Sequence, residues 1–138
     1  MLVIRNVQMI VKNGVYGPAD VRGTAVMMYD VEANQCAVTV EFKIDGQPDM
    51  VWVLDRELLI RGSNDTDGYG EGDVRLQYLG AGTNRNALTL RGEEGAATIV
   101  LNNEQLMAFL SRTTELVPVG QEDMSVEVDE LIEEILNS

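Results

Sequence analysis

The amino-acid sequence predicts an α+β protein: a mostly antiparallel sheet of about seven strands with two main helices late in the chain. Two observations support this prediction. Short segments of alternating apolar and polar residues, separated by turn residues, fill most of the first hundred positions, and a strong helical period appears only from about residue 102. The length of 138 residues suits one domain with one core, so we expect a single domain over 1–138.

The first part of the chain predicts a meander of antiparallel strands joined by turns. The clearest strand has an apolar residue at every second position from Cys36 to Ile44. Trp52 lies between Val51 and Val53 in the last strand of the meander, and we interpret it as a core residue rather than an exposed binding aromatic. The four strands are expected at 2–12, 24–30, 35–44 and 50–54.

A short helix and three more strands follow. Segment 55–62 has leucines at helical spacing, with Asp55 as its N-cap and Gly62 as its C-terminal stop. The later strands are expected at 73–79, 86–92 and 96–101, with a Gly-Glu-Glu-Gly turn between the last two.

The strongest helix signal covers 102–117. Asn102 is expected to cap this helix, and Gln105 stands at the capping-box position. Its apolar stripe consists of Leu106, Phe109 and Leu110.

The charge distribution is uneven. The net charge is −13, and no basic residue follows Arg112. Such a balance argues against unaided binding to nucleic acids or to anionic membranes, whose phosphates require Lys and Arg. The acidic end of the chain predicts an amphipathic helix at about 128–137. That helix either docks through its Leu/Ile face or offers an acidic face, or its apolar stripe, to a partner.

Residue types that carry catalysis are scarce. Histidine is absent, which excludes Ser-His and Cys-His nucleophile pairs. Cys36 is the single cysteine, so neither a disulfide nor a zinc cluster is expected, and its place within a strand favours a small core residue. We expect no cofactor. The amino-terminal segment resembles neither a signal peptide nor a membrane-spanning helix, which favours the cytoplasm.

The loop 63–73 resembles a metal site because it contains four carboxylates. With Gly68 at the sixth position of an EF-hand loop, the twelfth position is Val74 instead of the required glutamate. Aspartate and glycine are also ordinary turn residues. We favour a polar connection and keep a weak calcium site as the alternative. The four carboxylates are those of Asp65, Asp67, Glu71 and Asp73.

Five segments in order resemble the SsgA-like proteins of sporulating actinomycetes. The family pattern Trp-Val-Phe-x-Arg-Asp-Leu-Leu-x-x-Gly is resembled by Trp52 to Gly62, with Arg56 at the family's arginine position and differences on both sides of it. The resemblance covers roughly residues 24–136. The remaining matches are Tyr29-Asp30, Gly72 to Leu76, Phe109 to Thr113 with Val117 to Gly120, and Val128 to Leu136.

The resemblance implies a role in cell division rather than catalysis. Members of the family mark sites of sporulation septa and help to place or tether the tubulin-like division protein FtsZ. Their fold is a barrel-like sheet similar to that of the whirly single-stranded nucleic-acid binders, and they associate as trimers. We therefore expect a non-enzymatic, cytoplasmic homo-oligomer at the division septum. Its partner would be FtsZ, another division protein or another SsgA-like protein.

The resemblance also suggests which residues matter. Residues expected to contact a partner are Pro118, Gly120, Glu130, Glu133 and Glu134. Residues expected to be structural are Trp52, Gly62, Gly72 and Asp73, and Gly120 has a competing explanation as a turn residue that needs a positive φ.

The alternative function is that of a single-stranded nucleic-acid-binding module, suggested by the whirly-like fold. Fold analogy alone is a weak argument for function. The ten basic residues are scattered along an acidic chain, which opposes this alternative.

Overall fold

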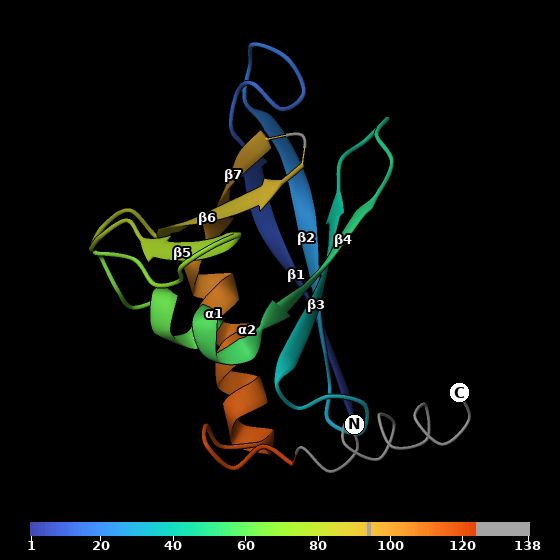
Figure 1. The fold of residues 1–138 in the computed structure, drawn as a ribbon, viewed down its shortest axis with the longest axis vertical. Helices are drawn as coiled ribbons and strands as arrows, with labels where there is room; N and C mark the ends of the chain where they lie inside the picture. The colour runs from blue at the N-terminus through green and yellow to red at the C-terminus, as the bar shows by residue number, and fades with distance from the viewer. Residues whose placement is uncertain (94, 124–138) are drawn as a thin grey trace.

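Seven antiparallel strands form one sheet in the order β4-β3-β2-β1-β7-β6-β5, and two helices pack against it. The structure is a computed structural model that describes residues 1–93 and 95–123. Figure 1 shows that the sheet curls into a half-barrel, with β5–β7 crossing β1–β4 at a steep angle. The predicted fold class is confirmed. The strands are β1 (Leu2–Val11), β2 (Val21–Asp30), β3 (Ala37–Lys43), β4 (Met50–Asp55), β5 (Val74–Tyr78), β6 (Arg85–Gly92) and β7 (Gly95–Asn102), and the helices are α1 (Arg56–Gly62) and α2 (Asn103–Leu116).

Alternation along the strands builds the core. In β3 the side chains of Val38, Val40 and Phe42 are buried, whereas their neighbours in sequence are not. The apolar stripe of α2 is buried as predicted. Each such side chain contributes roughly 1.5–3 kcal/mol when it leaves water. The prediction that Cys36 is a core residue within a strand is wrong, because β3 begins at Ala37 and Cys36, just before it, is only half-buried.

The two predicted helix caps are confirmed, but the capping box is not formed. The Asp55 side chain accepts a hydrogen bond from the Glu57 amide, and the Asn102 side chain accepts one from the Gln105 amide. The Gln105 side chain does not return to Asn102. Its Oε1 accepts the backbone N–H of Gln8 at 2.7 Å, so this residue joins α2 to β1.

Gly62 is the last residue of α1, but it does not act as the terminating glycine that the sequence predicts. The helix stops there as predicted, but the C-cap is Ser63, and Gly62 does not have the left-handed conformation of a terminating glycine. A Cβ at Gly62 would lie 2.6 Å from the Leu76 Cβ and 2.7 Å from the Leu76 carbonyl oxygen. The missing side chain therefore lets β5 pack directly on α1.

The loop 63–73 is a structured connection between α1 and β5. The Asp65 carboxylate accepts the Asp67 amide, and Tyr69 exchanges backbone hydrogen bonds with Leu76. Gly72 has a φ of +103°, which ordinary residues rarely adopt. Among residues 1–93 and 95–123, no three carboxylate or thiol side chains are placed to share a metal ion.

The predicted helix at 128–137 lies outside the described residues, so the extent of the domain over 1–138 stays a prediction. Within the described part of the chain, neither helix has the length and apolarity needed to cross a membrane.

Candidate partner-binding surface

Arg56 is the most heavily buried charged residue of the described structure. It is the first residue of α1, and its side chain is 0% exposed. Burial of a guanidinium without partners would cost several kcal/mol. The surrounding residues must therefore satisfy its charge, and they come from three separate parts of the chain: the end of α2, β2 and the residues after α2.

One set of partners is the carboxyl-terminal end of α2. The Arg56 Nη1 donates to the carbonyl oxygens of Thr113 at 3.1 Å and Val117 at 2.7 Å. Terminal helix carbonyls lack partners within the helix and carry partial negative charge. Helix α2 has no basic residue in its own last turn, so Arg56 supplies that charge from α1. The guanidinium also lies 5.1 Å from the centroid of the Tyr29 ring, a cation–π contact.

The other partner is Glu122. Its Oε1 accepts from Arg56 Nη2 in an ion pair, and its Oε2 accepts the Gly120 amide at 2.9 Å. The hydrogen bond from Arg56 is the largest of the effects that hold the pKa of the Glu122 carboxyl below its ordinary value. One carboxylate thus ties the chain after α2 to the buried arginine.

Residues Pro118–Asp123 form what we call the carboxyl-terminal turn. The Gln121 amide donates to the Pro118 carbonyl at 3.0 Å, and Gly120 has a φ of +87° with open space around it. Glycine is the usual residue for positive φ at the third position of a four-residue turn. Beyond it, the Asp123 amide donates to Gln35 Oε1 at 2.6 Å. The turn is therefore fixed at both ends.

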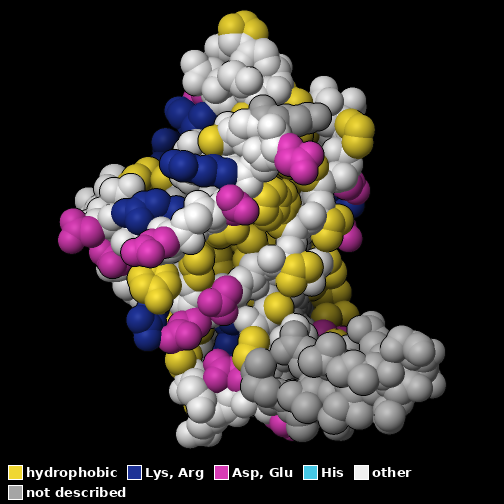
Figure 2. Space-filling model, viewed as in Figure 1, with side chains coloured by type: hydrophobic (Ala, Val, Ile, Leu, Met, Phe, Trp, Pro, Cys, Tyr) yellow, Lys and Arg dark blue, Asp and Glu magenta, His cyan; other side chains and the backbone are white. Residues whose placement is uncertain are grey.

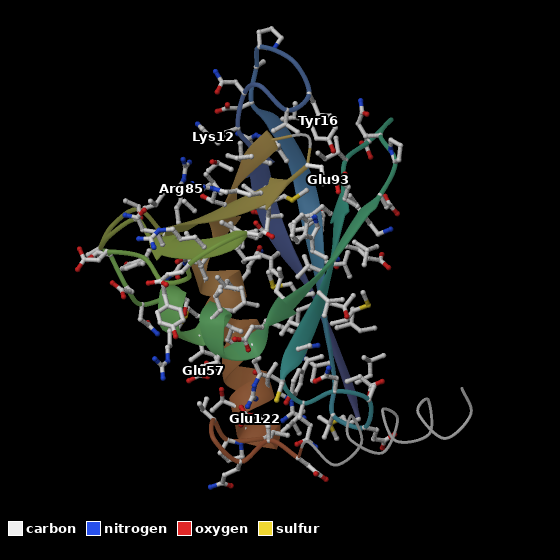
Figure 3. All side chains as sticks on the ribbon, viewed as in Figure 1. Lys12, Tyr16, Glu57, Arg85, Glu93 and Glu122 are labelled. Carbon is white, nitrogen blue, oxygen red and sulfur yellow. The ribbon has the colours of Figure 1, made fainter. Side chains whose placement is uncertain are left out.

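The surface of this turn combines apolar and acidic groups. Val119 is 44% exposed, and Pro118 beside it is also exposed. A hollow of about 130 Å³ next to the turn is lined by Val119 and three carboxylate residues, including Glu57 of α1 and Glu122. Figure 3 shows Glu57 above Glu122 at the lower end of the molecule. Such a surface is suited to a partner that presents an apolar side chain beside a basic one.

The structure brings only part of the predicted site together. Pro118 and Gly120 belong to the carboxyl-terminal turn. Gly72 and Asp73 lie elsewhere, directly before β5, and the Asp73 carbonyl accepts the Arg91 amide. Trp52 is half-buried against the core. The three predicted acidic contacts Glu130, Glu133 and Glu134 lie outside the described residues.

Sequence reasoning missed the two residues that organise this surface, Arg56 and Glu122. Arg56 stood among ten apparently scattered basic residues, and Glu122 among the many acidic ones. The available signal was the family segment around Trp52, in which Arg56 is kept while both of its neighbours differ.

Comparison with known proteins finds one family that matches this chain. The family model described as Streptomyces sporulation and cell division protein, SsgA, matches residues 24–122, which include both Arg56 and Glu122. The sporulation-specific cell division protein SsgB of Thermobifida fusca is 35% identical over 103 residues, covering 73% of this chain and 72% of that protein. SsgB of Streptomyces coelicolor is 31% identical over 81% of this chain and 80% of its own length.

Two solved structures share the fold. The crystal structure of an SsgA-like sporulation-specific cell division protein from Thermobifida fusca superposes with a TM-score of 0.80 at 29% identity, covering 97% of this chain and 95% of the other. A structure from work on SsgB mutations and longitudinal cell division during sporulation of Streptomyces coelicolor gives a TM-score of 0.76 at 28% identity over 88% and 93% of the two chains.

Proposed function

This chain belongs to the SsgA family of sporulation and cell division proteins, and on that premise we propose that it acts in septation during sporulation. The relatives named above are sporulation-specific cell division proteins, and the family match spans residues 24–122. We propose that the protein works by binding other proteins rather than by catalysis. The absence of histidine from the sequence agrees with this proposal.

The proposed mechanism is attachment of FtsZ, or of another division protein, at the septum through the carboxyl-terminal turn. The observation that supports this surface is the ion pair between Arg56 and Glu122, which holds an exposed Pro118-Val119 pair in a fixed position. Binding to a rigid surface avoids part of the entropy loss that accompanies association.

We also propose that the protein acts as a homo-oligomer, with a trimer as the expected state. The outer face of β1 and β4 supports self-association because it exposes large apolar side chains. Leu2 is 53% exposed, Val51 59% and Val53 65%, and β4 is an edge strand of the sheet. Exposed apolar faces and free strand edges favour protein–protein contacts.

The test is light scattering of the purified protein alone and with FtsZ, using Val119→Asp and a matched control. Leu79→Asp is the control, because Leu79 is 41% exposed, also lies in a connection, and is far in sequence from the turn. We expect the wild type and Leu79→Asp to shift the mass of FtsZ complexes, and Val119→Asp to bind at least tenfold more weakly.

If Val119→Asp and Leu79→Asp bind FtsZ equally well, the turn is not part of the interface. If the wild type does not bind FtsZ, FtsZ is not the direct partner. Val119 is a cleaner probe than Gly120→Asp. The latter is expected to impair septum placement, but it would also strain a backbone with a φ of +87°.

A further inference from the structure

A second surface feature is a hollow of about 530 Å³ that lies where β2, β1, β7 and β6 run side by side. Its lining includes two arginines, Arg22 and Arg85, and not one aspartate or glutamate. The hollow therefore has a positively charged lining, although the chain as a whole has a net charge of −13. We call it the basic hollow, and it shares no lining residue with the carboxyl-terminal turn.

The sheet register places the two arginines on opposite sides of an apolar floor. Arg22 of β2 pairs with Ile10 of β1, and Ile10 pairs with Val100 of β7. Val100 in turn pairs with Ala87 of β6, which lies two positions after Arg85. Because neighbouring strands lie about 4.8 Å apart, the backbones that carry the arginines are separated by roughly 14 Å. Ile10 and Val100 are half-buried between them.

Neither arginine forms an ion pair with a carboxylate within the described residues. Five of the ten basic side chains form ion pairs within the described residues, but neither Arg22 nor Arg85 is among them, and both are exposed. Figure 2 shows Lys and Arg side chains gathered over β5 and β6, and Figure 3 places Arg85 at the start of β6. Exposed guanidinium groups of this kind form bidentate hydrogen bonds with carboxylates.

The amino-terminal end of α2 adds to the positive potential but does not bind an anion itself. Asn102 is both the N-cap of α2 and part of the lining. The first three amides of the helix are already satisfied, because the Asn84 backbone and side-chain oxygens accept from Asn103 and Glu104, and Asn102 accepts from Gln105. The dipole of the helix still favours negative charge at this end.

We propose that the basic hollow binds an acidic segment of a protein partner. Two carboxylates of the segment pair with Arg22 and Arg85, and an apolar side chain between them covers Ile10 and Val100. A nucleic acid is a poorer fit, because the lining contains no aromatic residue on which a base would stack.

The test is fluorescence anisotropy of the full chain with a fluorescein-labelled peptide, Glu-Leu-Glu-Glu-Leu-Glu. We expect saturable binding at low ionic strength that weakens as salt is added. The double variant Arg22→Gln/Arg85→Gln is expected to bind at least tenfold more weakly. Arg91→Gln is the matched control, because Arg91 lies on the same face of β6 as Arg85 but outside the hollow, and it should bind within twofold of the wild type.

Three results would overturn the proposal. The wild type could fail to bind the peptide at low salt. The double variant could bind as well as the wild type, with circular dichroism showing it to be folded. A labelled oligothymidine could bind more tightly than the peptide and depend on the same two arginines, which would assign the hollow to nucleic acid. None of these results depends on septation, so the proposed function is judged separately.

Discussion

The carboxyl-terminal turn and the loop 63–73 are both glycine-containing connections that receive hydrogen bonds from an arginine, Arg56 for the turn and Arg75 for the loop, but these two arginines lie in different environments. Arg56 is wholly buried and bonds to two carbonyls and to Glu122. Arg75 is exposed and donates to the carbonyls of Asp67 and Gly70. Water can replace the partners of Arg75, whereas it has no access to Arg56. The same hydrogen-bonding chemistry therefore contributes differently to stability in the two regions.

The largest expected effect comes from removing the buried arginine. Arg56→Leu removes the hydrogen bonds to the Thr113 and Val117 carbonyls and to Glu122 Oε1, and we expect a loss of about 3 kcal/mol in the free energy of unfolding. The exposed counterpart, Arg75→Gln, should change it by no more than about 0.5 kcal/mol. Urea unfolding followed by Trp52 fluorescence measures both. Equal losses of unfolding free energy in the two variants would contradict the proposed difference between the two regions.

For glycine substitutions we expect the opposite order, with the larger loss of stability in the loop 63–73 and the smaller loss in the carboxyl-terminal turn. A Cβ at Gly70 would lie 2.3 Å from the Val74 carbonyl oxygen, whereas one at Gly120 would meet no atom within 4 Å. We expect Gly70→Ala to cost about 3 kcal/mol through steric overlap and backbone strain, and Gly120→Ala about 1 kcal/mol through strain alone. Thermal unfolding of both variants tests this order. A larger loss at Gly120 would show that the turn is packed more tightly than the structure indicates.

The smallest expected effect depends on pH. The pKa of the Glu122 carboxyl is lowered in the fold, chiefly by Arg56. A carboxyl whose pKa is lower in the folded chain stabilises the fold above its unfolded pKa of about 4.3, and this contribution disappears as pH falls through the folded pKa. Glu122→Gln should therefore be less stable than the wild type by about 1–2 kcal/mol at pH 7. Below about pH 4 the difference should shrink. A gap that stays constant between pH 7 and pH 3 in urea titrations would exclude this role for the ion pair.

The sequence predicted the parts of the fold that depend on near neighbours. Alternation located the strands, and Asp55 and Asn102 marked the helix starts, because a cap bonds to an amide two or three residues away. The predictions that were wrong depend on contacts between residues that are far apart in the sequence. Gln105 bonds to β1 instead of closing a capping box, and Gly62 is small because Leu76 packs on it.

The candidate surface was predicted only in part for the same reason. Pro118 and Gly120 were found through a family pattern, since a turn is visible in a short segment. Arg56 escaped notice because burial is a property of the folded chain and its partners are distant in sequence. In the sequence alone, a buried arginine and a solvated one such as Arg22 look alike.

The sequence separation between Arg56 and its partners also bears on the order of events during protein synthesis. Thr113, Val117 and Glu122 follow Arg56 by 57, 61 and 66 residues. A growing chain has completed β1 to α1 long before these residues leave the ribosome. Until then the guanidinium must remain hydrated, so α1 cannot settle into the core ahead of α2. We therefore expect the arrival of residues 113–122 to be the step that completes the fold, and the surface proposed to meet other proteins to exist only on a finished chain.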